Sequence, residues 1–301
     1  MAYLQLRKLQ QLVAAPLLIT NPQDLFYLTG HFLMDGGYLL ITPTQVVMLG
    51  GYLENTKGLQ TDSFKNLLKY LGKFSRIEID DTTSLRDLRL IKKYAPKVKI
   101  KAVPSPVKEL RLIKTSDELV KMKQAYEITT KVFSEVKKVL KSKTWTEIEL
   151  AQFIKLSGLK YGADDISFPV IVASGKNAAI PHHVPTDVKI KSGESVVLDF
   201  GFKVQGYCSD FTRTVFFKTI TKQLREMYVA AEQAYWLGLT AVHEGVLAKD
   251  VDLTARNFLQ TKGFSKYFIH SLGHGTGLDV HERPNLHPNS QQVLKAGMVF
   301  S

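Results

Sequence analysis

Two aspartates in the middle of the chain stand where they could share a cation. Residues 195–203 and 207–217 are rich in β-branched and aromatic residues, with a short glycine-containing break between them. This pattern predicts a β-hairpin. Asp199 lies in the first predicted strand and Asp210 in the second. A turn centred on residues 204–205 would set the two side chains opposite each other, roughly 5 Å apart.

Facing carboxylates among apolar neighbours repel each other, and one of them would have to take up a proton. A divalent cation removes this conflict, and two metal ions roughly 3.5–4 Å apart are a known hydrolytic device. A bulge at Gly206 would shift the register by one residue. The alternative is structural: Asp210 opens a turn with Ser209, and Asp199 packs against an arginine such as Arg213.

Histidines cluster on either side of this hairpin in the sequence. They are His182, His183, His270, His274 and His281. A single histidine is more often a satisfied core or surface residue than a ligand. Imidazoles near two paired carboxylates favour metal binding and proton transfer instead. Glycines flank His274 and allow a tight backbone with an exposed ring. The helical zinc-protease pattern HExxH is absent.

The composition is typical of a folded intracellular protein. The chain has 301 residues, about two domains by size, and 45% of them are hydrophobic, which excludes a disordered chain. A single cysteine, Cys208, excludes an internal disulfide and predicts a cytoplasmic location. It could be a thiol ligand, but a small buried filler is the favoured interpretation.

The charge and hydropathy exclude some partners. No apolar run is long enough to span a membrane. The formal net charge is +12, which raises nucleic acid as a partner. No nucleic-acid-binding motif or aromatic platform accompanies the lysine clusters, so solvated helix faces are favoured and neither nucleic acid nor membrane is expected to bind.

Short strands alternate with helices in the N-terminal third, which predicts a small α/β domain over residues 1–110. The strands are expected at residues 16–20, 38–41, 46–49, 77–79 and 98–103, and the helices at 65–71 and 84–94. Pro104 and Pro106 mark the boundary to a second domain, residues 111–301.

The second domain reads as two helices followed by strands, twice over, a weak hint of internal duplication. Thr115 and Glu118 form a capping box that begins a long amphipathic helix. A second capping box, Thr144 with Glu147 or Thr146 with Glu149, begins the next helix. Helices are expected again at residues 222–242 and 249–261.

Three segments together resemble a known family. SFPVIVASGKNAAIPHH (167–183), VVLDFGFKVQGYCSDFTRT (196–214) and HSLGHGTGLDVHE (270–282) look like the motifs of proline-specific pita-bread metallopeptidases, namely Xaa-Pro dipeptidase and aminopeptidase P. NPQDLFYLTG (21–30) and RLIKTSDE (111–118) are similar to the N-terminal domain and linker of these enzymes. The resemblance implies an α+β pita-bread catalytic domain preceded by a smaller creatinase-type α/β domain.

The resemblance also implies a role for each site residue. Asp199 would ligate one of two divalent metal ions, Asp210 would bridge both, and His274 would ligate the second. His182 and His281 would handle substrate and proton as catalytic residues, and His270 would help line the pocket. The metal would be manganese, with cobalt or zinc as alternatives. The substrate would be a proline-containing dipeptide or oligopeptide, and the protein a homodimer.

The implied reaction is hydrolysis of an X-Pro bond, which has no N–H on the proline nitrogen. A metal-activated water would attack the carbonyl, with His281 or His182 stabilising the oxyanion or protonating the leaving nitrogen.

The family carries two further glutamate ligands, and the chain ends at Ser301 before the first. We therefore expect a C-terminally truncated form with weak metal binding and little activity. A creatinase-like hydrolase and a non-catalytic pita-bread binding protein are the alternatives.

Overall fold

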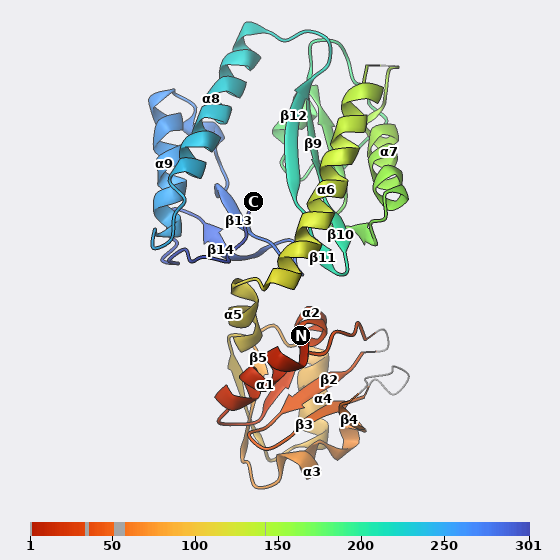
Figure 1. Ribbon diagram of the computed structural model, residues 1–301, viewed down its shortest axis with the longest axis vertical. Coiled ribbons are helices and arrows are strands. Elements are labelled where there is room, and N and C mark those ends of the chain that lie inside the picture. Colours follow the sequence, from red (N-terminus) through yellow and green to blue (C-terminus); the bar gives the residue numbers. More distant parts are fainter. Residues whose placement is uncertain (1, 34–35, 51–57, 142) are drawn as a thin grey trace. The chain divides into compact units, whose positions relative to one another are not determined.

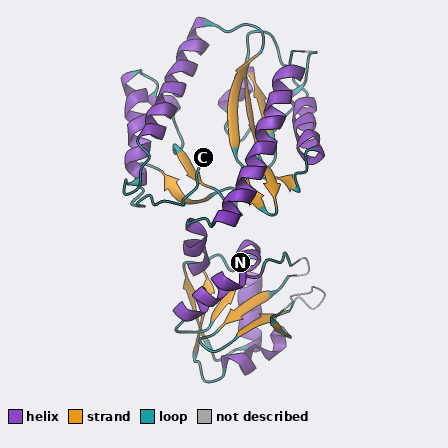
Figure 2. Cartoon of the chain, in the orientation of Figure 1, coloured by secondary structure: helices purple, strands orange, loops and turns teal. Residues whose placement is uncertain are grey.

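The structure is a computed structural model that describes residues 2–33, 36–50, 58–141 and 143–301 (Figure 1). The chain divides into two compact units, Met1–Arg111 and Leu112–Ser301. Both units combine helices with strands (Figure 2). None of the helices within the described residues is long and apolar enough to cross a membrane.

The N-terminal unit is built on a six-stranded mixed sheet with the strand order β4-β3-β2-β1-β5-β6. The strands are β1 (Leu17–Ile19), β2 (Tyr38–Ile41), β3 (Val46–Leu49), β4 (Gln60–Asp62), β5 (Arg76–Asp80) and β6 (Lys99–Val103). β1, β5 and β6 are parallel, whereas β2 pairs antiparallel with β1 and β3. The predicted strands of this unit are confirmed, and β4 was not predicted.

Helices cover this sheet and lead into the second unit. They are α1 (Ala2–Leu12), α2 (Pro22–Thr29), α3 (Leu67–Leu71), α4 (Leu85–Tyr94) and α5 (Pro106–Leu112), with a 3-10 turn η1 (Phe64–Asn66) before α3. The two predicted helices are confirmed. α2 was missed although it carries clear signals: Asn21 caps its N-terminus, Pro22 opens it and Gly30 ends it with a φ of 77°.

The C-terminal unit follows the predicted order of two helices and then strands, twice. The first half contains α6 (Ser116–Val139), α7 (Glu147–Lys160), β7 (Asp165–Ile166), β8 (Ile171–Ser174), the 3-10 turn η2 (Gly175–Ala179), β9 (Ser195–Phe200), β10 (Phe202–Val204), β11 (Tyr207–Cys208) and β12 (Phe211–Phe216). The second half contains α8 (Lys222–Thr240), α9 (Ala248–Thr261), η3 (Ser265–Tyr267), β13 (Gly273–Gly275) and β14 (Glu282–Leu286). Figure 1 shows the helix pairs on opposite sides of this unit with strands between them.

Capping boxes set the start of both helices in the first half. The Thr115 side chain accepts the Glu118 N–H, and the Glu118 carboxylate accepts the Thr115 N–H. Thr146 and Glu149 form the same arrangement at α7, so the second of the two predicted alternatives is the one that forms. Each box satisfies N–H groups that an isolated helix end leaves without partners.

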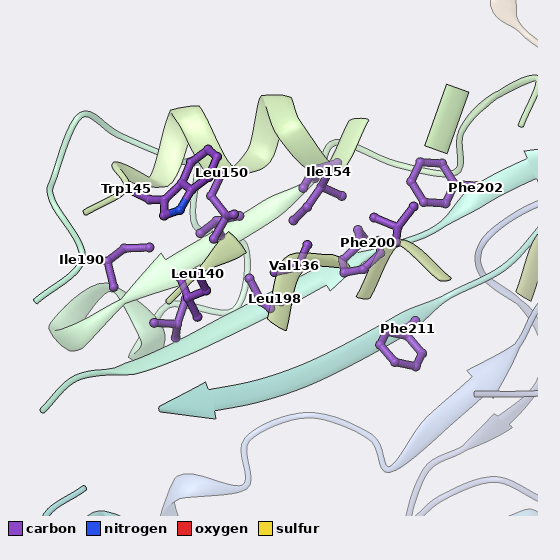
Figure 3. Close-up of a cluster of buried hydrophobic side chains, with 14 of the residues drawn as sticks. Val136, Leu140, Trp145, Leu150, Ile154, Ile190, Leu198, Phe200, Phe202 and Phe211 are labelled. Carbon is purple, nitrogen blue, oxygen red and sulfur yellow. The ribbon is translucent and has the colours of Figure 1, made fainter. Parts of the chain in front are cut away.

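The main core of the unit lies between these helices and the sheet β12-β9-β8. Figure 3 shows five side chains of this core converging in one cluster: Val136 of α6, Leu140 directly after α6, Ile154 of α7, and Leu198 and Phe200 of β9. All five side chains are buried. Burial of a large apolar side chain stabilises the fold by about 1.5–3 kcal/mol. This cluster therefore anchors β9, the strand that carries Asp199.

The predicted hairpin forms around a turn one residue later than expected. Gln205 and Gly206 are its two central residues, with φ values of 49° and 83°, and Val204 pairs with Tyr207. Positive φ at both central residues is typical of a type I′ two-residue turn, whose twist matches the flanking strands. The turn centre therefore lies between residues 205 and 206.

Because of this later turn, each residue of β9 pairs with a residue two positions further along the chain than predicted. Asp199 pairs with Thr212, and Asp210 lies just before β12. The prediction that Asp199 and Asp210 face each other directly was therefore wrong. Side chains on a strand alternate between faces with a period of two, so a two-residue shift preserves the face. The two carboxylates remain close enough for the charge of Asp210 to act on Asp199.

Candidate active site

Asp199 lies on β9 and is held by one hydrogen bond across the sheet. The Thr212 hydroxyl donates to Asp199 Oδ1 at 2.8 Å. Burial raises the pKa of the Asp199 carboxyl to about 6, against the hydrogen bond from Thr212, which lowers it. The negative charge of Asp210 raises this pKa further, and His182 and His274 lower it. Asp199 is thus a carboxylate whose negative charge is poorly compensated by its surroundings.

Asp210 contacts an imidazole from the other half of the unit. His274 Nε2 lies 3.3 Å from Asp210 Oδ2, and the Ser301 hydroxyl donates to the same oxygen at 2.8 Å. Ser301 is in turn placed by two backbone hydrogen bonds with His274, of 3.1 and 2.9 Å. The glycine-rich segment thus brings the predicted imidazole ligand to the predicted bridging carboxylate.

The backbone fixes the tautomer of His274. Its Nδ1 lies 3.1 Å from the Gly275 carbonyl oxygen, and a carbonyl oxygen can only accept a hydrogen bond. Nδ1 therefore carries the proton, and in the neutral ring Nε2 keeps its lone pair. An imidazole held in this way presents Nε2 as a metal ligand, which is the usual arrangement at protein metal sites.

His281 and His182 complete a group of imidazoles near the two carboxylates. The ring centroids of His274 and His281 are 4.2 Å apart and tilted by 51°. Burial lowers the pKa of His281, and the neighbouring His274 and His182 lower it further while Asp210 raises it. Both His281 and His182 remain exposed, so a substrate can reach them.

The other two histidines have different partners. The ring of His183 is within 2.8 Å of the buried Glu147 carboxylate, so His183 belongs to the scaffold. His270 donates through Nδ1 to the Ser271 carbonyl oxygen at 2.7 Å and packs edge-on against Phe268. Within the described residues, no contact links the His270 side chain to Asp199 or Asp210. Its place in the pocket stays a prediction.

The structural alternative for Asp199 is not what the structure shows. The Arg213 guanidinium stacks on the Phe211 ring at 4.0 Å and donates to the Thr212 carbonyl oxygen. Across the described ranges, no lysine or arginine forms an ion pair with Asp199 or Asp210. Neither carboxylate is therefore neutralised by a lysine or an arginine.

Cys208 is a poor candidate ligand. It is buried, and burial raises the pKa of its thiol to about 11. Its Sγ lies 3.7 Å from the Leu278 carbonyl oxygen. A metal binds the thiolate form, which burial disfavours here, so Cys208 fits the predicted role of a small buried filler.

Gly201 lets the backbone just after Asp199 approach the backbone just before Asp210. It separates β9 from β10, and a Cβ atom built on it would lie only 1.9 Å from the Ser209 carbonyl oxygen. Ser209 is held in place by Thr129 of α6, with 2.7 Å between the two hydroxyl oxygens. Any side chain at position 201 would therefore push apart the backbone on which Asp199 and Asp210 are mounted.

Two buried acids that the sequence analysis did not assign to the site hold the histidine-bearing segments in place. Asp252 of α9 is fully buried and forms two hydrogen bonds with Arg256, of 2.8 and 3.0 Å. It also accepts the Leu272 N–H, while Arg256 donates to the carbonyl oxygens of Phe268 and His270. This arrangement, called here the α9 clamp, holds residues 268–272 just before His274. Glu147 of α7 is the second such acid.

Glu282, which follows His281, also has a structural partner. Its carboxylate lies 3.1 Å from the Lys114 ammonium, and the side chains of Lys114 and Glu282 are 1% and 8% exposed. It accepts the Asp279 N–H as well. Glu282 is thus neutralised by a buried cation, which makes it a poor candidate ligand.

The donor set fits a divalent cation in its chemistry. In the described part of the chain, no three His, Cys, Asp or Glu side chains are already gathered closely enough to share one ion. Asp210 and His274 are paired, however, and Asp199 is destabilised as an anion by burial and by Asp210. A cation would remove that cost, and carboxylates with imidazole are suitable ligands for Mn²⁺, Co²⁺ or Zn²⁺.

The chain matches a known family model and several known proteins. A model described as metallopeptidase family M24 matches residues 120–301. The Xaa-Pro dipeptidase of Pyrococcus furiosus is 30% identical over 292 residues, which cover 94% of this chain and 83% of the relative. The Xaa-Pro dipeptidase of Pyrococcus horikoshii is 31% identical over 298 residues, covering 96% of this chain and 84% of the relative.

Solved structures agree over almost the whole chain. An Xaa-Pro dipeptidase from Bacillus anthracis superposes with a TM-score of 0.92 at 28% identity, covering 100% of this chain and 89% of that chain. A prolidase from Pyrococcus furiosus superposes with a TM-score of 0.87 at 28% identity, covering 100% of this chain and 90% of that chain.

Proposed function

Because this chain belongs to metallopeptidase family M24, we propose that it hydrolyses the peptide bond that precedes a proline, using divalent metal ions. The predicted pita-bread fold with a smaller α/β N-terminal part is confirmed. The proposed substrate is an Xaa-Pro dipeptide, with a longer peptide as the alternative. The similarity to two Xaa-Pro dipeptidases over more than nine tenths of the chain supports this choice.

One observation carries the proposal: Asp210 and His274, from opposite halves of the unit, meet at 3.3 Å with Asp199 beside them. None of the three is paired with a lysine or an arginine in the described residues. We assign Asp199, Asp210 and His274 to the metal, Asp210 as the bridging ligand and manganese as the metal. Bound metal would lower the pKa of water and polarise the substrate carbonyl.

The other side chains would handle substrate and protons. Burial and the neighbouring imidazoles lower the pKa of His281, so its ring is neutral at neutral pH. A neutral ring can donate an N–H to the substrate carbonyl oxygen where negative charge develops. His182, exposed and close enough to influence Asp199, is the second candidate for this role or for protonating the leaving nitrogen. His270 is proposed to line the pocket.

Further aspects rest on the same family membership. We propose a cytoplasmic homodimer, since a single buried cysteine suits a reducing compartment. Neither nucleic acid nor membrane is proposed as a partner. The two additional glutamate ligands implied by the family have no counterpart in residues 1–301. A polypeptide of these residues alone is therefore proposed to bind metal weakly and to turn over slowly.

The deciding experiment measures proline release from Met-Pro in the presence of Mn²⁺, with Met-Ala as the control substrate. The proposal predicts hydrolysis of Met-Pro that requires the metal and is lost in the Asp210→Asn variant. Asp250→Asn, which removes an exposed carboxylate on α9, is the matched control and should retain activity. Equal rates for both substrates, or full activity after chelation of the metal, would refute the proposed function.

A further inference from the structure

Glu147 is an unusually well-satisfied buried carboxylate. It is the first residue of α7 and is 0% exposed. One oxygen accepts the N–H and the hydroxyl of Ser174 and the amide of Asn177, at 2.7–3.1 Å. The other accepts the ring N–H of His183 and the N–H and hydroxyl of Thr186, at 2.8–3.1 Å. All six donors come from the single segment 174–186.

No strong base balances this charge. In the described structure, the only basic side chain at Glu147 is the His183 ring. A buried carboxylate without a lysine or arginine is stable only if hydrogen-bond donors replace its lost hydration. Because the donors all lie in residues 174–186, this segment must adopt the conformation that points them inward. The carboxylate therefore determines the shape of the segment.

Backbone hydrogen bonds tie the end of this segment and Val188, two residues beyond it, to the start of α7. The Glu147 N–H donates to the Val188 carbonyl oxygen at 3.2 Å, and the Ile148 N–H donates to the Thr186 carbonyl oxygen at 3.0 Å. The side chain of Glu147 and the backbone of the first turn of α7 thus both bind this segment. We call Glu147 with its six donors the α7 clamp.

The two neighbouring histidines, His182 and His183, lie in different environments. His183 turns inward to Glu147 and is anchored there. His182, one residue earlier, is exposed, has no hydrogen-bond partner in the described residues, and lies close enough to Asp199 and His281 to influence both. A single peptide unit separates the anchored ring from the exposed one, so the position of His183 limits where His182 can point.

We propose that Glu147 is a positioning residue that, through His183 and Thr186, holds the segment carrying His182 in place beside Asp199. This inference rests on the proposed function for its catalytic consequence, but not for its structural one. Glu147 does not contact the site itself. It acts by restricting the loop that carries His182, much as partners outside the ligand shell orient ligands at metal sites.

The structural consequence is tested by hydrogen exchange in the Glu147→Gln variant. Glutamine keeps the size of the side chain but turns one acceptor oxygen into an NH₂ group that faces N–H and O–H donors. Amides of residues 174–188 should exchange about tenfold faster or more, because this loop opens locally. Glu149→Gln is the matched control, since it lies on the same helical turn and glutamine still serves in a capping box. Unchanged exchange in residues 174–188 of Glu147→Gln would overturn the proposal.

The catalytic consequence is tested by a double-mutant cycle on Met-Pro hydrolysis. Glu147→Gln should reduce kcat about 10- to 100-fold, the range seen when such supporting partners are removed. In a His182→Ala background the same substitution should cost less than about twofold, because Glu147 acts through His182. An equal cost in both backgrounds would show that Glu147 only maintains the fold, and would overturn the positioning role.

A milder variant covers the case in which Glu147→Gln does not fold. Thr186→Val removes one hydroxyl donor and leaves the carboxylate and the Thr186 N–H in place. Thr186→Val should show the same faster hydrogen exchange and the same loss of kcat, each to a smaller degree. Losses of kcat that add independently to that of His182→Ala would contradict the proposal. If the wild-type protein hydrolyses no X-Pro peptide, the proposed function fails, while the hydrogen-exchange result still decides whether Glu147 holds the loop.

Discussion

The α9 clamp makes a quantitative prediction about stability. Asp252 is 0% exposed and accepts two hydrogen bonds from Arg256 and one from the Leu272 N–H. The Asp252→Asn variant removes the negative charge and one acceptor oxygen while keeping the shape of the side chain. Arg256 would then keep its charge beside a neutral amide, with its remaining hydrogen bonds to two backbone carbonyl oxygens.

The expected loss of unfolding free energy in Asp252→Asn follows from the burial of Asp252. Removing one partner of a fully buried ion pair costs about 3–5 kcal/mol. The Arg256 side chain is 24% exposed, so water recovers part of its solvation and the lower end of that range applies. Asparagine also retains one oxygen that can accept a hydrogen bond. We therefore expect a loss of about 2–3 kcal/mol in the unfolding free energy of the C-terminal unit.

Chemical denaturation followed by tryptophan fluorescence measures this loss, because Trp145 and Trp236 both lie in the C-terminal unit. For a unit of this size, the loss corresponds to a fall in Tm of about 5–10 °C. Hydrogen exchange should accelerate first in residues 268–272, which the clamp holds. Asp250→Asn, an exposed change on the same helix, should cost less than about 1 kcal/mol. A loss in Asp252→Asn no larger than in this control would refute the reasoning.

Three other predictions concern the carboxylates and the strand junction. Asp210→Asn should reduce Met-Pro hydrolysis about 1000-fold or more and abolish the increase in Tm caused by Mn²⁺; activity within a few-fold of wild type would contradict its assignment. Burial works to raise the pKa of Glu147, but the hydrogen bonds from His183 and Ser174 prevail and lower it from 4.5 to about 2. Its contribution to stability is therefore complete above about pH 4.5 and lost as the pH falls towards 2, so Glu147→Gln should flatten the acid limb of a stability–pH curve. Gly201→Ala should destabilise the unit by about 1–3 kcal/mol, measured by denaturant melts, because the new methyl group meets the Ser209 carbonyl oxygen.

Local signals in the sequence predicted the elements well. The capping boxes at Thr115 and Thr146 locate the starts of α6 and α7, because such boxes satisfy N–H groups within a few residues of each other. The alternation of strands and helices likewise predicted the N-terminal sheet. The missed helix α2 carried equally local signals at Asn21 and Gly30, so it was within reach of the same reasoning.

The hairpin shows where local reasoning falls short. The position of a turn depends on which two residues adopt positive φ, and Gly206 could serve as either the second central residue or a bulge. The structure uses Gln205 with Gly206, and glutamine is not a residue that favours positive φ. The turn is centred one residue later than predicted. The residue that pairs with Asp199 is therefore Thr212, two positions beyond the predicted Asp210.

The two clamps depend on contacts that sequence spacing does not reveal. Glu147 meets donors 27 to 39 residues further along the chain, and nothing near it in the sequence distinguishes it from Glu149. Asp252 and Arg256 are spaced like a surface ion pair on a helix. Only the burial of Asp252 and the contacts of Arg256 with residues 268 and 270 show their structural role.

If Asp199 and Asp210 hold metal as proposed, the close approach at Gly201 would also limit how the site could adapt to a different ion. A methyl group there would lie 1.9 Å from a backbone oxygen, so no small increase in side-chain size can widen the gap gradually. Selection for a larger or smaller cation would have to act on the reach of the side chains at positions 199 and 210, with the main chain beneath them held constant. On the proposed assignment, ion selectivity would then depend on the length of these two side chains and not on movement of the main chain.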